Sequence, residues 1–439
     1  LINVHDNGAA DDGDDTLTIN GADGTATEDD TFLLRKDFVA LLNDTYSTAE
    51  GYEQLERVNY DSNINEQLIV NGLGGEDTFA ADDNSSLTTL DGGTGNDTFQ
   101  IGQIFATLRT VDAANITASA DEFDTTRVII GIITNAAGDV IFDHSQDSLT
   151  DAKIAEIESL IAADGYLPGI AYVSDGVSYD TTILGGDDDD DFSVYQNKGT
   201  LRLEGQDGND DFIIRAFVLL PESGTTAEAQ AETDVLGGAD DDNIQYAINA
   251  PVNIDGGSGF DTVVVLGTPF PDAFVVTDQG IFGAGLNVAF ANVESAELDS
   301  LEGDDTICVL ATNPDLVTRV ITGQGDDTVN VMGDVVLDIV SAGADDYPPQ
   351  DQNLGQIQGP LFIQGGVLEG ADRTFTDPVM LPGEINGDIF LENNSDQTGD
   401  IDILNVFHTD NDLAQLGALV GRINPFNSQD EEWVGLTGF

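Results

Sequence analysis

The chain has 439 residues, and its 83 acidic residues against 12 basic ones give a formal net charge of −71. Nucleic acid and anionic lipid surfaces carry charge of the same sign and are therefore poor partners. Hydrophobic residues make up 40% of the chain and include 21 Phe, which is too much apolar surface for a disordered protein.

The first predicted block, residues 1–110, combines β-strands with two glycine loops. Its apolar stretch at 31–43 favours either a short helix or a pair of strands. Further on, Asp77 closes the loop Gly-Gly-Glu-Asp, and Asp97 closes Gly-Gly-Thr-Gly-Asn-Asp 20 positions later. Each aspartate is followed by Thr-Phe, which returns the chain to a strand with one apolar side chain facing inward.

Residues 111–182 form an insertion between two repeat blocks and contain the clearest helix signal of the chain. In the stretch 148–165, Ser148 or Thr150 can cap the helix and Gly165 can end it. One face is apolar and consists of Ile154, Ile157, Leu160 and Ile161. We expect this helix either to pack over a flank of the repeat blocks or to form a partner-binding module.

Residues 183–345 form the main repeat block, in which closing aspartates again come in pairs. The pairs are Asp190 with Asp210, Asp242 with Asp261, and Asp305 with Asp327, at spacings of 20, 19 and 22 residues, about one coil of a β-solenoid. The residues between paired loops share one register. A first strand starts at Phe79, Phe192, Ile244 and Ile307, and an asparagine corner follows at Asn84, Asn197, Asn249 and Asn313. A second strand then closes at Leu90, Leu203, Ile254 and Ile321. This register favours stacked coils over unrelated surface turns.

Residues 346–439 are interpreted as an extended connector, with five prolines in 346–383, followed by the start of a further β module. The first seven residues, Leu-Ile-Asn-Val-His-Asp-Asn, resemble Leu-Asn-Val-Phe-His-Thr-Asp-Asn at 404–411. This similarity either marks the end of one long module and the start of the next, or arises by chance. The chain opens at Leu1 without a signal peptide, which is typical of a piece of a larger precursor.

The chemistry of the loops points to Ca²⁺, a hard cation that takes about six to eight oxygen ligands from carboxylates and backbone carbonyls. Glycine lets a loop turn so that several carbonyls converge, and a second loop one coil away would complete the shell. We therefore expect several bound Ca²⁺ ions. The candidate ligand residues are Asp77, Asp97, Asp188, Asp190, Asp207, Asp210, Asp240, Asp242, Asp261, Asp305 and Asp327, with Gly92, Gly93, Gly95, Gly256, Gly257 and Gly259 shaping the loops.

This pattern resembles the haemolysin-type (RTX) calcium-binding repeats, Gly-Gly-x-Gly-x-Asp-x-apolar-x. Residues 92–99 and 256–263 match it in full, whereas Asp188 and Asp240 stand where the family has glycine and the Asp305 loop is truncated. The resemblance implies a parallel β-roll, secretion, and folding outside the cell where Ca²⁺ is millimolar. Segments at 272–297, 358–361 and 402–406 also look like parts of very large bacterial surface proteins built from such repeats.

The family has two loops per coil, whereas this chain has one loop per 19 to 22 residues within each pair. We therefore expect an all-β fold: a parallel β-helix or β-roll-like solenoid with calcium loops along one edge, interrupted by the small α-containing insertion. The single Cys308 excludes an internal disulfide, so metal ions are the expected staples of an exported fold.

The sequence argues against an enzyme, because its three histidines are scattered and no catalytic motif is present. The sequence contains no run of about 18 apolar residues, so it predicts no membrane-spanning helix. Two extracellular functions remain. The first is a structural protein, a module or subunit of a bacterial surface layer, sheath or filament that self-associates and is rigidified by Ca²⁺. The second is an adhesin stalk or binding module that recognises a glycan or cell surface.

Overall fold

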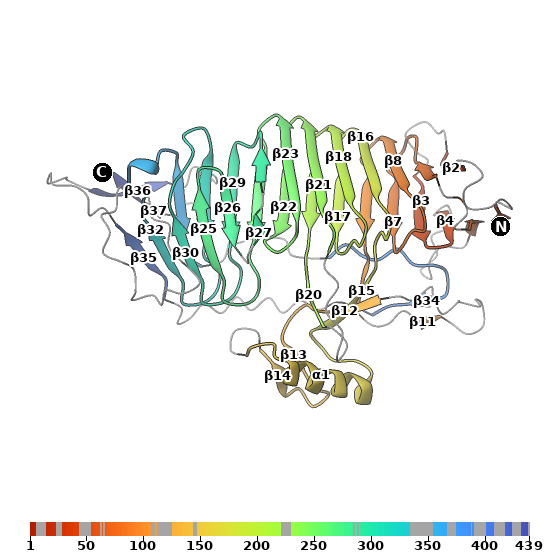
Figure 1. Ribbon diagram of the computed structural model, residues 1–439, viewed down its shortest axis with the longest axis horizontal. Helices are drawn as coiled ribbons and strands as arrows, with labels where there is room; N and C mark the ends of the chain where they lie inside the picture. The colour runs from red at the N-terminus through yellow and green to blue at the C-terminus, as the bar shows by residue number, and fades with distance from the viewer. Residues whose placement is uncertain are drawn as a thin grey trace.

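The chain forms a long, mainly parallel β-solenoid with one small helical insertion on its side (Figure 1). This computed structural model describes residues 1–5, 15–22, 29–43, 54–61, 64, 66–106, 110–111, 125–143, 147–220, 230–283, 286–287, 289–333, 354–366, 375–387, 389, 401–407, 418–423 and 432–437. Over these residues, the helices are α1 (Asp151–Asp164) and a short 3₁₀ turn at Leu354–Gln356. The expected all-β solenoid is confirmed.

Three sheets form the walls of the solenoid. Sheet A runs in the order β1 (Ile2–Asn3), β5 (Gln54–Asn59), β4 (Phe38–Asn43), β3 (Thr31–Arg35), β7 (Thr78–Ala81), β9 (Thr98–Ile101), β17 (Asp191–Val194), β19 (Asp211–Ile214), β22 (Asn243–Ala247), β24 (Thr262–Leu266), β29 (Ser295–Asp299), β31 (Val317–Ile321) and β33 (Leu361–Gln364). Sheet B contains β2 (Thr16–Asn20), β6 (Gln67–Asn71), β8 (Thr88–Thr94), β16 (Thr181–Asp187), β18 (Leu201–Asp207), β21 (Thr233–Ala239), β23 (Val252–Ser258) and β28 (Ala289–Ala291). Sheet C contains β27 (Leu286–Asn287), β26 (Gly280–Gly283), β25 (Ala273–Thr277), β30 (Thr306–Val309), β32 (Thr328–Val331) and β35 (Ile403–Val406).

The glycine loops change corner along the solenoid. From β6 to β24 each coil runs through sheet B, turns at a glycine loop and returns through sheet A. The hairpin of β25 and β26 then opens sheet C, and from β29 onward each coil runs through sheet A, turns at the loop and continues in sheet C. The loops therefore form two rows, one at the B–A corner and one at the A–C corner.

Identical side chains stack on one another through the core, because each parallel strand pairs with its equivalent in the next coil. Five stacked phenylalanines have ring centroids 4.5–5.0 Å apart from one coil to the next: Phe32, Phe79, Phe99, Phe192 and Phe212. The alternation of buried and outward residues along the strands places them inside. Burial of each ring stabilises the fold by about 1.5–3 kcal/mol.

The insertion has a small core of its own. The four-stranded sheet of β10 (Ile104–Phe105), β15 (Ile170–Ser174), β12 (Thr125–Ile129) and β20 (Val218–Leu219) lies beside the hairpin of β13 (Ile133–Thr134) and β14 (Val140–Phe142). Helix α1 begins after Thr150, whose side chain accepts the Lys153 N–H, and ends at the left-handed Gly165, as predicted. Its Ile157 and Ile161 pack with Phe142 and Ile170, in a cluster distinct from the solenoid core.

Two stretches near the ends of the chain can be compared with the sequence-based interpretation. Residues 31–43 form the antiparallel strands β3 and β4, the strand-pair alternative for this stretch, and not a helix. Strand β33 lies in the stretch interpreted as an extended connector and β35 in the part expected to start a further β module, and both pair with strands of the same solenoid. Residues 418–437 include one hairpin, formed by β36 (Ala418–Ile423) and β37 (Glu432–Thr437).

The segment 375–386 runs back across the side of sheet A and is held there by a buried ion pair. Its strand β34 (Glu384–Ile385) pairs with β11 (Thr110–Val111), and Val379 and Leu381 pack on Leu33 and Phe38. Arg35 donates to both Glu384 oxygens at 2.8 Å and to Asp82 at 2.9 Å. All three side chains are at most 5% exposed.

Candidate metal centre

The closing aspartates form two continuous rows rather than four separate pairs. In each step the backbone N–H of one aspartate donates to Oδ1 of the aspartate one coil later, at 2.7–2.9 Å. The row at the B–A corner contains Asp77, Asp97, Asp190, Asp210, Asp242 and Asp261, and the row at the A–C corner contains Asp305 and Asp327. The step from Asp97 to Asp190 is as regular as the others although the insertion separates them in sequence.

Each of these eight carboxylates has one buried oxygen without a partner. The side chains are 0–2% exposed. Their Oδ1 atoms each accept a backbone N–H of the preceding coil, whereas Oδ2 receives no hydrogen bond of ordinary geometry in any of the eight. At the A–C corner the hydroxyls of Ser300 and Thr322 lie near enough to lower the pKa of Asp305 and Asp327. Leaving a buried ionised oxygen unpaired is costly, so a proton or a cation is required to stabilise it.

At the B–A corner, the first glycine of each loop makes room for this oxygen. A Cβ added at Gly92 would overlap Asp97 Oδ2 and also the carbonyl oxygen of Gly185 in the next coil. The same two kinds of oxygen crowd Gly72, Gly185, Gly205 and Gly237. A carboxylate oxygen and a backbone carbonyl therefore converge at each of these coils, on a backbone position that admits only glycine.

Burial raises the pKa of the closing aspartates far above the usual value of 3.8. The backbone N–H donated to each carboxylate lowers its pKa, and neighbouring carboxylates raise it further. The pKa reaches about 6 for Asp77 and Asp210, about 7 for Asp97, Asp242 and Asp327, and about 8 for Asp190 and Asp305. For Asp261, burial likewise raises the pKa.

A second ladder of side chains runs beside the first with the opposite direction. Asp189 Oδ1 accepts the backbone N–H of Asn209 one coil later at 2.8 Å, and Asp241 Oδ1 accepts that of Phe260 at 2.8 Å. Asp304 and Asp326 continue this pattern at the A–C corner. In five coils, the side chain before the closing aspartate thus ties its coil to the following one: Asp189, Asn209, Asp241, Asp304 and Asp326.

The remaining predicted residues surround the rows without joining them. Asp188, Asp207 and Asp240 are exposed on the loops. Asp188 and Asp240 have φ of 81° and 72°, the left-handed conformation that Gly95 adopts at the equivalent position. Gly93 and Gly257 turn the loops with φ near 105°, while Gly256 and Gly259 lie close against backbone oxygens of neighbouring coils.

Three further residues belong to the rows although the glycine-loop motif does not mark them. Asp30 and Asp272 start the two rows, and each donates its backbone N–H to the next aspartate at 2.7 Å. Glu294 ends the first row by accepting the Asp261 N–H at 2.9 Å. No glycine pair precedes Asp272 or Glu294, so the loop motif does not identify them. Ser295 opens the strand after Glu294 as Thr does in several other coils, but Ala273 follows Asp272, so no local signal marks that residue.

The asparagine corners separate into two buried and two other positions. Asn84 and Asn197 are fully buried; Asn84 donates to carbonyl and hydroxyl oxygens of its own and the next coil and accepts two backbone N–H groups at 2.7 and 2.8 Å. Asn249 has a buried, unpaired Oδ1. Asn313 turns its loop by accepting the Asp315 N–H.

The rows fit a hard cation only with help from the backbone. Among the described residues, no three His, Cys, Asp or Glu side chains lie close enough together to form a metal site by themselves. A Ca²⁺ ion in the rows would be held by one carboxylate oxygen per coil together with backbone carbonyls of the glycine loops. This donor set, all oxygen and negatively charged, is the kind that Ca²⁺ prefers.

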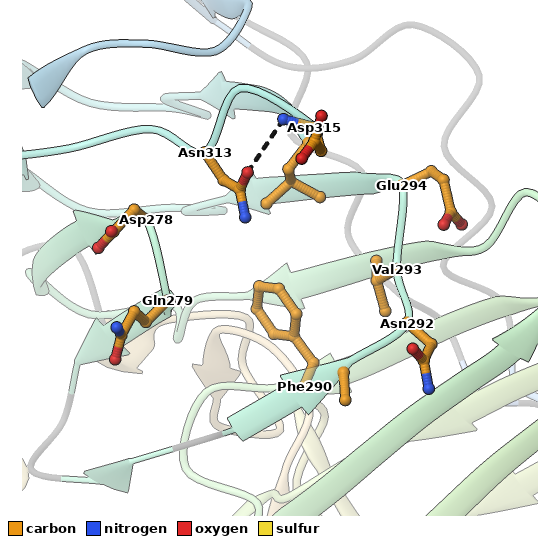
Figure 2. A pocket seen from close by; sticks show the side chains of 10 residues that line it. Asp278, Gln279, Phe290, Asn292, Val293, Glu294, Asn313 and Asp315 are labelled. Carbon is orange, nitrogen blue, oxygen red and sulfur yellow. Dashed lines mark hydrogen bonds between the residues drawn. The ribbon is translucent and has the colours of Figure 1, made fainter.

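A pocket of about 300 Å³ opens where sheet B ends at β28 (Figure 2). Turns from three coils line it, and Phe290 and Leu316 contribute apolar surface among acids and amides. Its lining contains no basic side chain, which disfavours anionic ligands.

No helix of the described residues is both long and apolar enough to cross a lipid bilayer. No family model matches the chain, and comparisons with curated proteins and with solved structures gave no match.

Proposed function

We propose that this chain is a secreted calcium-binding structural protein, a module or subunit of a bacterial surface layer, sheath or extracellular filament that Ca²⁺ rigidifies. The observation that supports this function is the pair of aspartate rows, in which eight buried carboxylates each keep one oxygen unpaired. No catalysis is part of the proposal.

Negative charge dominates the energetics of the rows. The chain carries a net charge of −71, and the rows place ionisable groups in direct succession along the inside corner of the solenoid. At neutral pH a bound cation would remove the repulsion between coils and the penalty of the unpaired oxygens together. Extracellular calcium modules bind with dissociation constants of about 10⁻⁴–10⁻³ M, so Ca²⁺ outside the cell would keep such sites filled.

The RTX resemblance supports the same choice of ion. Residues 92–99 and 256–263 match that repeat in full, and both glycine loops occupy the B–A corner where the first row runs. The one-loop-per-coil arrangement allows ions between successive coils along a single edge. An elongated rod stiffened at this edge suits a mechanical role at a cell surface.

Calorimetric titration tests the proposal directly. Wild-type chain, stripped with EDTA at pH 7.5, should bind several Ca²⁺ ions, and its melting temperature should rise with Ca²⁺ according to mass action. Asp97→Asn and Asp261→Asn should each lower the stoichiometry, whereas Glu66→Gln, at an exposed position, should not. Equal stoichiometry in all four proteins would remove the rows from consideration. Electron microscopy with Ca²⁺ and with chelator then distinguishes filament, lattice and monomer.

The insertion favours one alternative function, an adhesin stalk that binds a glycan or a cell surface. The insertion projects from the side of the solenoid and has a separate core (Figure 1). Because β9 pairs directly with β17, a variant in which a short linker replaces residues 111–174 should retain the stacked coils. Loss of saturable glycan or cell binding in that variant, with unchanged Ca²⁺ binding, would support the adhesin.

A further inference from the structure

Both ends of the solenoid expose large apolar side chains on or beside strands at a sheet edge. Leu1 is 82% and Ile2 60% exposed at one end, and Ile401, Ile403 and Leu404 are 49–65% exposed at the other. Strand β1 is the edge of sheet A and β35 the edge of sheet C, and no described strand pairs with their outer sides. Figure 1 shows the N-terminus and β35 at opposite ends of the rod.

These edges are also uncharged in a strongly acidic chain. Strand β1 reads Ile-Asn and β35 reads Ile-Leu-Asn-Val. Soluble proteins usually protect open strand edges with charges, prolines or bulges, because an unprotected edge pairs with another strand. Neither strand carries a charge, a proline or a bulge, although β1 is short, with two residues, and the chain has 83 acidic residues.

Amide ladders give each end a direction. Asn59 Nδ2 donates to Asn3 Oδ1 at 2.7 Å, and Asn405 Nδ2 donates to Asn330 Oδ1 at 3.0 Å. In both, the later coil donates to the earlier one, as Asn71 does to Asn20 at 2.7 Å. An amide that uses Oδ1 on one side turns Nδ2 to the other. Asn3 therefore presents a donor at the N-terminal end, and Asn405 presents an acceptor at the C-terminal end.

The two edge strands also match residue by residue. Ile2-Asn3-Val4 and Leu404-Asn405-Val406 have the same order of apolar, amide and apolar side chains. Inside the solenoid, pairing strands obey the same rule, since Thr78-Phe79 lies on Thr98-Phe99, and Asn3 on Asn59. A junction of Leu404 on Ile2, Asn405 on Asn3 and Val406 on Val4 would therefore continue the stack. The outer halves of the related segments, 6–7 and 408–411, lie outside the described residues.

We propose that copies of this chain associate head to tail, with β35 of one copy pairing in parallel with β1 of the next through an Asn3–Asn405 amide bond. This proposal rests on the self-association included in the proposed function and adds the surface that carries it. A second copy is the favoured occupant because the donor end and the acceptor end are both present on one chain.

Two charge variants test the junction while preserving the contacts within each chain. In Asn3→Asp the carboxylate still accepts from Asn59 but faces the acceptor of Asn405; in Asn405→Lys the ammonium still donates to Asn330 but faces the donor of Asn3. Sedimentation velocity of the 439-residue chain in millimolar Ca²⁺ should show concentration-dependent association of wild type. Each variant alone should raise the dissociation constant at least about tenfold, since the junction then buries an unmatched polar pair.

An equimolar mixture of the two variants should recover association, because Lys faces Asp in one junction and the native pair forms in the other. Gln279→Glu is the control: it adds a negative charge at an exposed position in the turn between β25 and β26, away from both end strands, and should associate like wild type. Association of wild type that neither variant weakens, or that the mixture fails to restore, would overturn the junction while leaving a self-associating structural protein in place. A wild type that stays monomeric at all concentrations would overturn both the junction and the self-association of the proposed function. Calorimetric titration would then still decide, independently, whether the chain binds Ca²⁺.

Discussion

The Asp97→Asn substitution removes one buried negative charge at constant shape, so it separates the effect of charge from that of packing. The amide Oδ1 can still accept the Asp77 N–H, which lies 2.7 Å away. Burial, opposed by that N–H and reinforced by neighbouring carboxylates, raises the pKa of Asp97 from 3.8 to about 7 in the folded chain. At pH 8 the ionised carboxylate is therefore less stable in the folded chain than in the unfolded chain. Three pKa units correspond to about 4 kcal/mol.

We expect opposite consequences with and without the ion. In EDTA at pH 8, Asp97→Asn should raise the free energy of unfolding by about 2–4 kcal/mol, the lower value allowing for relaxation of the neighbouring charges. In 10 mM Ca²⁺ the wild type gains about 1.4–2.7 kcal/mol from each site with a dissociation constant of about 0.1–1 mM, and the variant loses one such gain.

Urea unfolding followed by far-ultraviolet circular dichroism measures both quantities, with Glu66→Gln as the control for removing a charge at an exposed position. A variant that is less stable than wild type in EDTA at pH 8, and that gains as much from Ca²⁺ as wild type does, would refute the reasoning.

In EDTA, the stability that the protonated closing aspartates provide should be fully present below about pH 4. It should be lost as the pH rises through about 6 to 8, the range of their pKa values in the folded chain. Urea midpoints that increase from pH 5 to pH 7 and pH 9 would contradict this. Gly92→Ala should cost about 2–4 kcal/mol because its Cβ meets two oxygens, whereas Gly131→Ala, whose nearest neighbour is 4.0 Å away, should change the melting temperature little. Arg35→Met should lower the free energy of unfolding in urea by about 3–5 kcal/mol, because it leaves two buried carboxylates without a positive partner. The control is Arg202→Met, which removes a more exposed ion pair and should cost little. A loss in Arg35→Met as small as that in Arg202→Met would show that the buried pair contributes nothing.

Local and periodic features of this fold were predictable from sequence. Helix α1 carries its cap, apolar face and terminating glycine within one short stretch, so its bounds followed from helix physics. The spacing of the closing aspartates predicted stacked coils because a parallel solenoid repeats its turn chemistry at each coil. Asp77 and Asp97 indeed lie in neighbouring coils and are joined by a 2.7 Å hydrogen bond.

Features that depend on distant pairing were not predictable. The step from Asp97 to Asp190 spans the insertion, so periodicity stops in sequence while it continues in space. The loops at Asp305 and Asp327 resemble the earlier loops in sequence, yet they occupy another corner. The reason is that the β25–β26 hairpin, which lies between Asp261 and Asp305 in the chain, starts sheet C. The buried partner of Arg35 is Glu384, which lies in a proline-containing stretch without a periodic signal.

The uninterrupted Phe column across the insertion has an architectural consequence. Phe99 and Phe192 stack at 5.0 Å, the separation found between coils that are contiguous in the chain. Each coil therefore recognises its neighbour by shape and register, without regard to the length of polypeptide that leaves and re-enters between them. A domain inserted between two such coils can therefore be gained, exchanged or lost during evolution without changing the stacking of the coils or the row of aspartates.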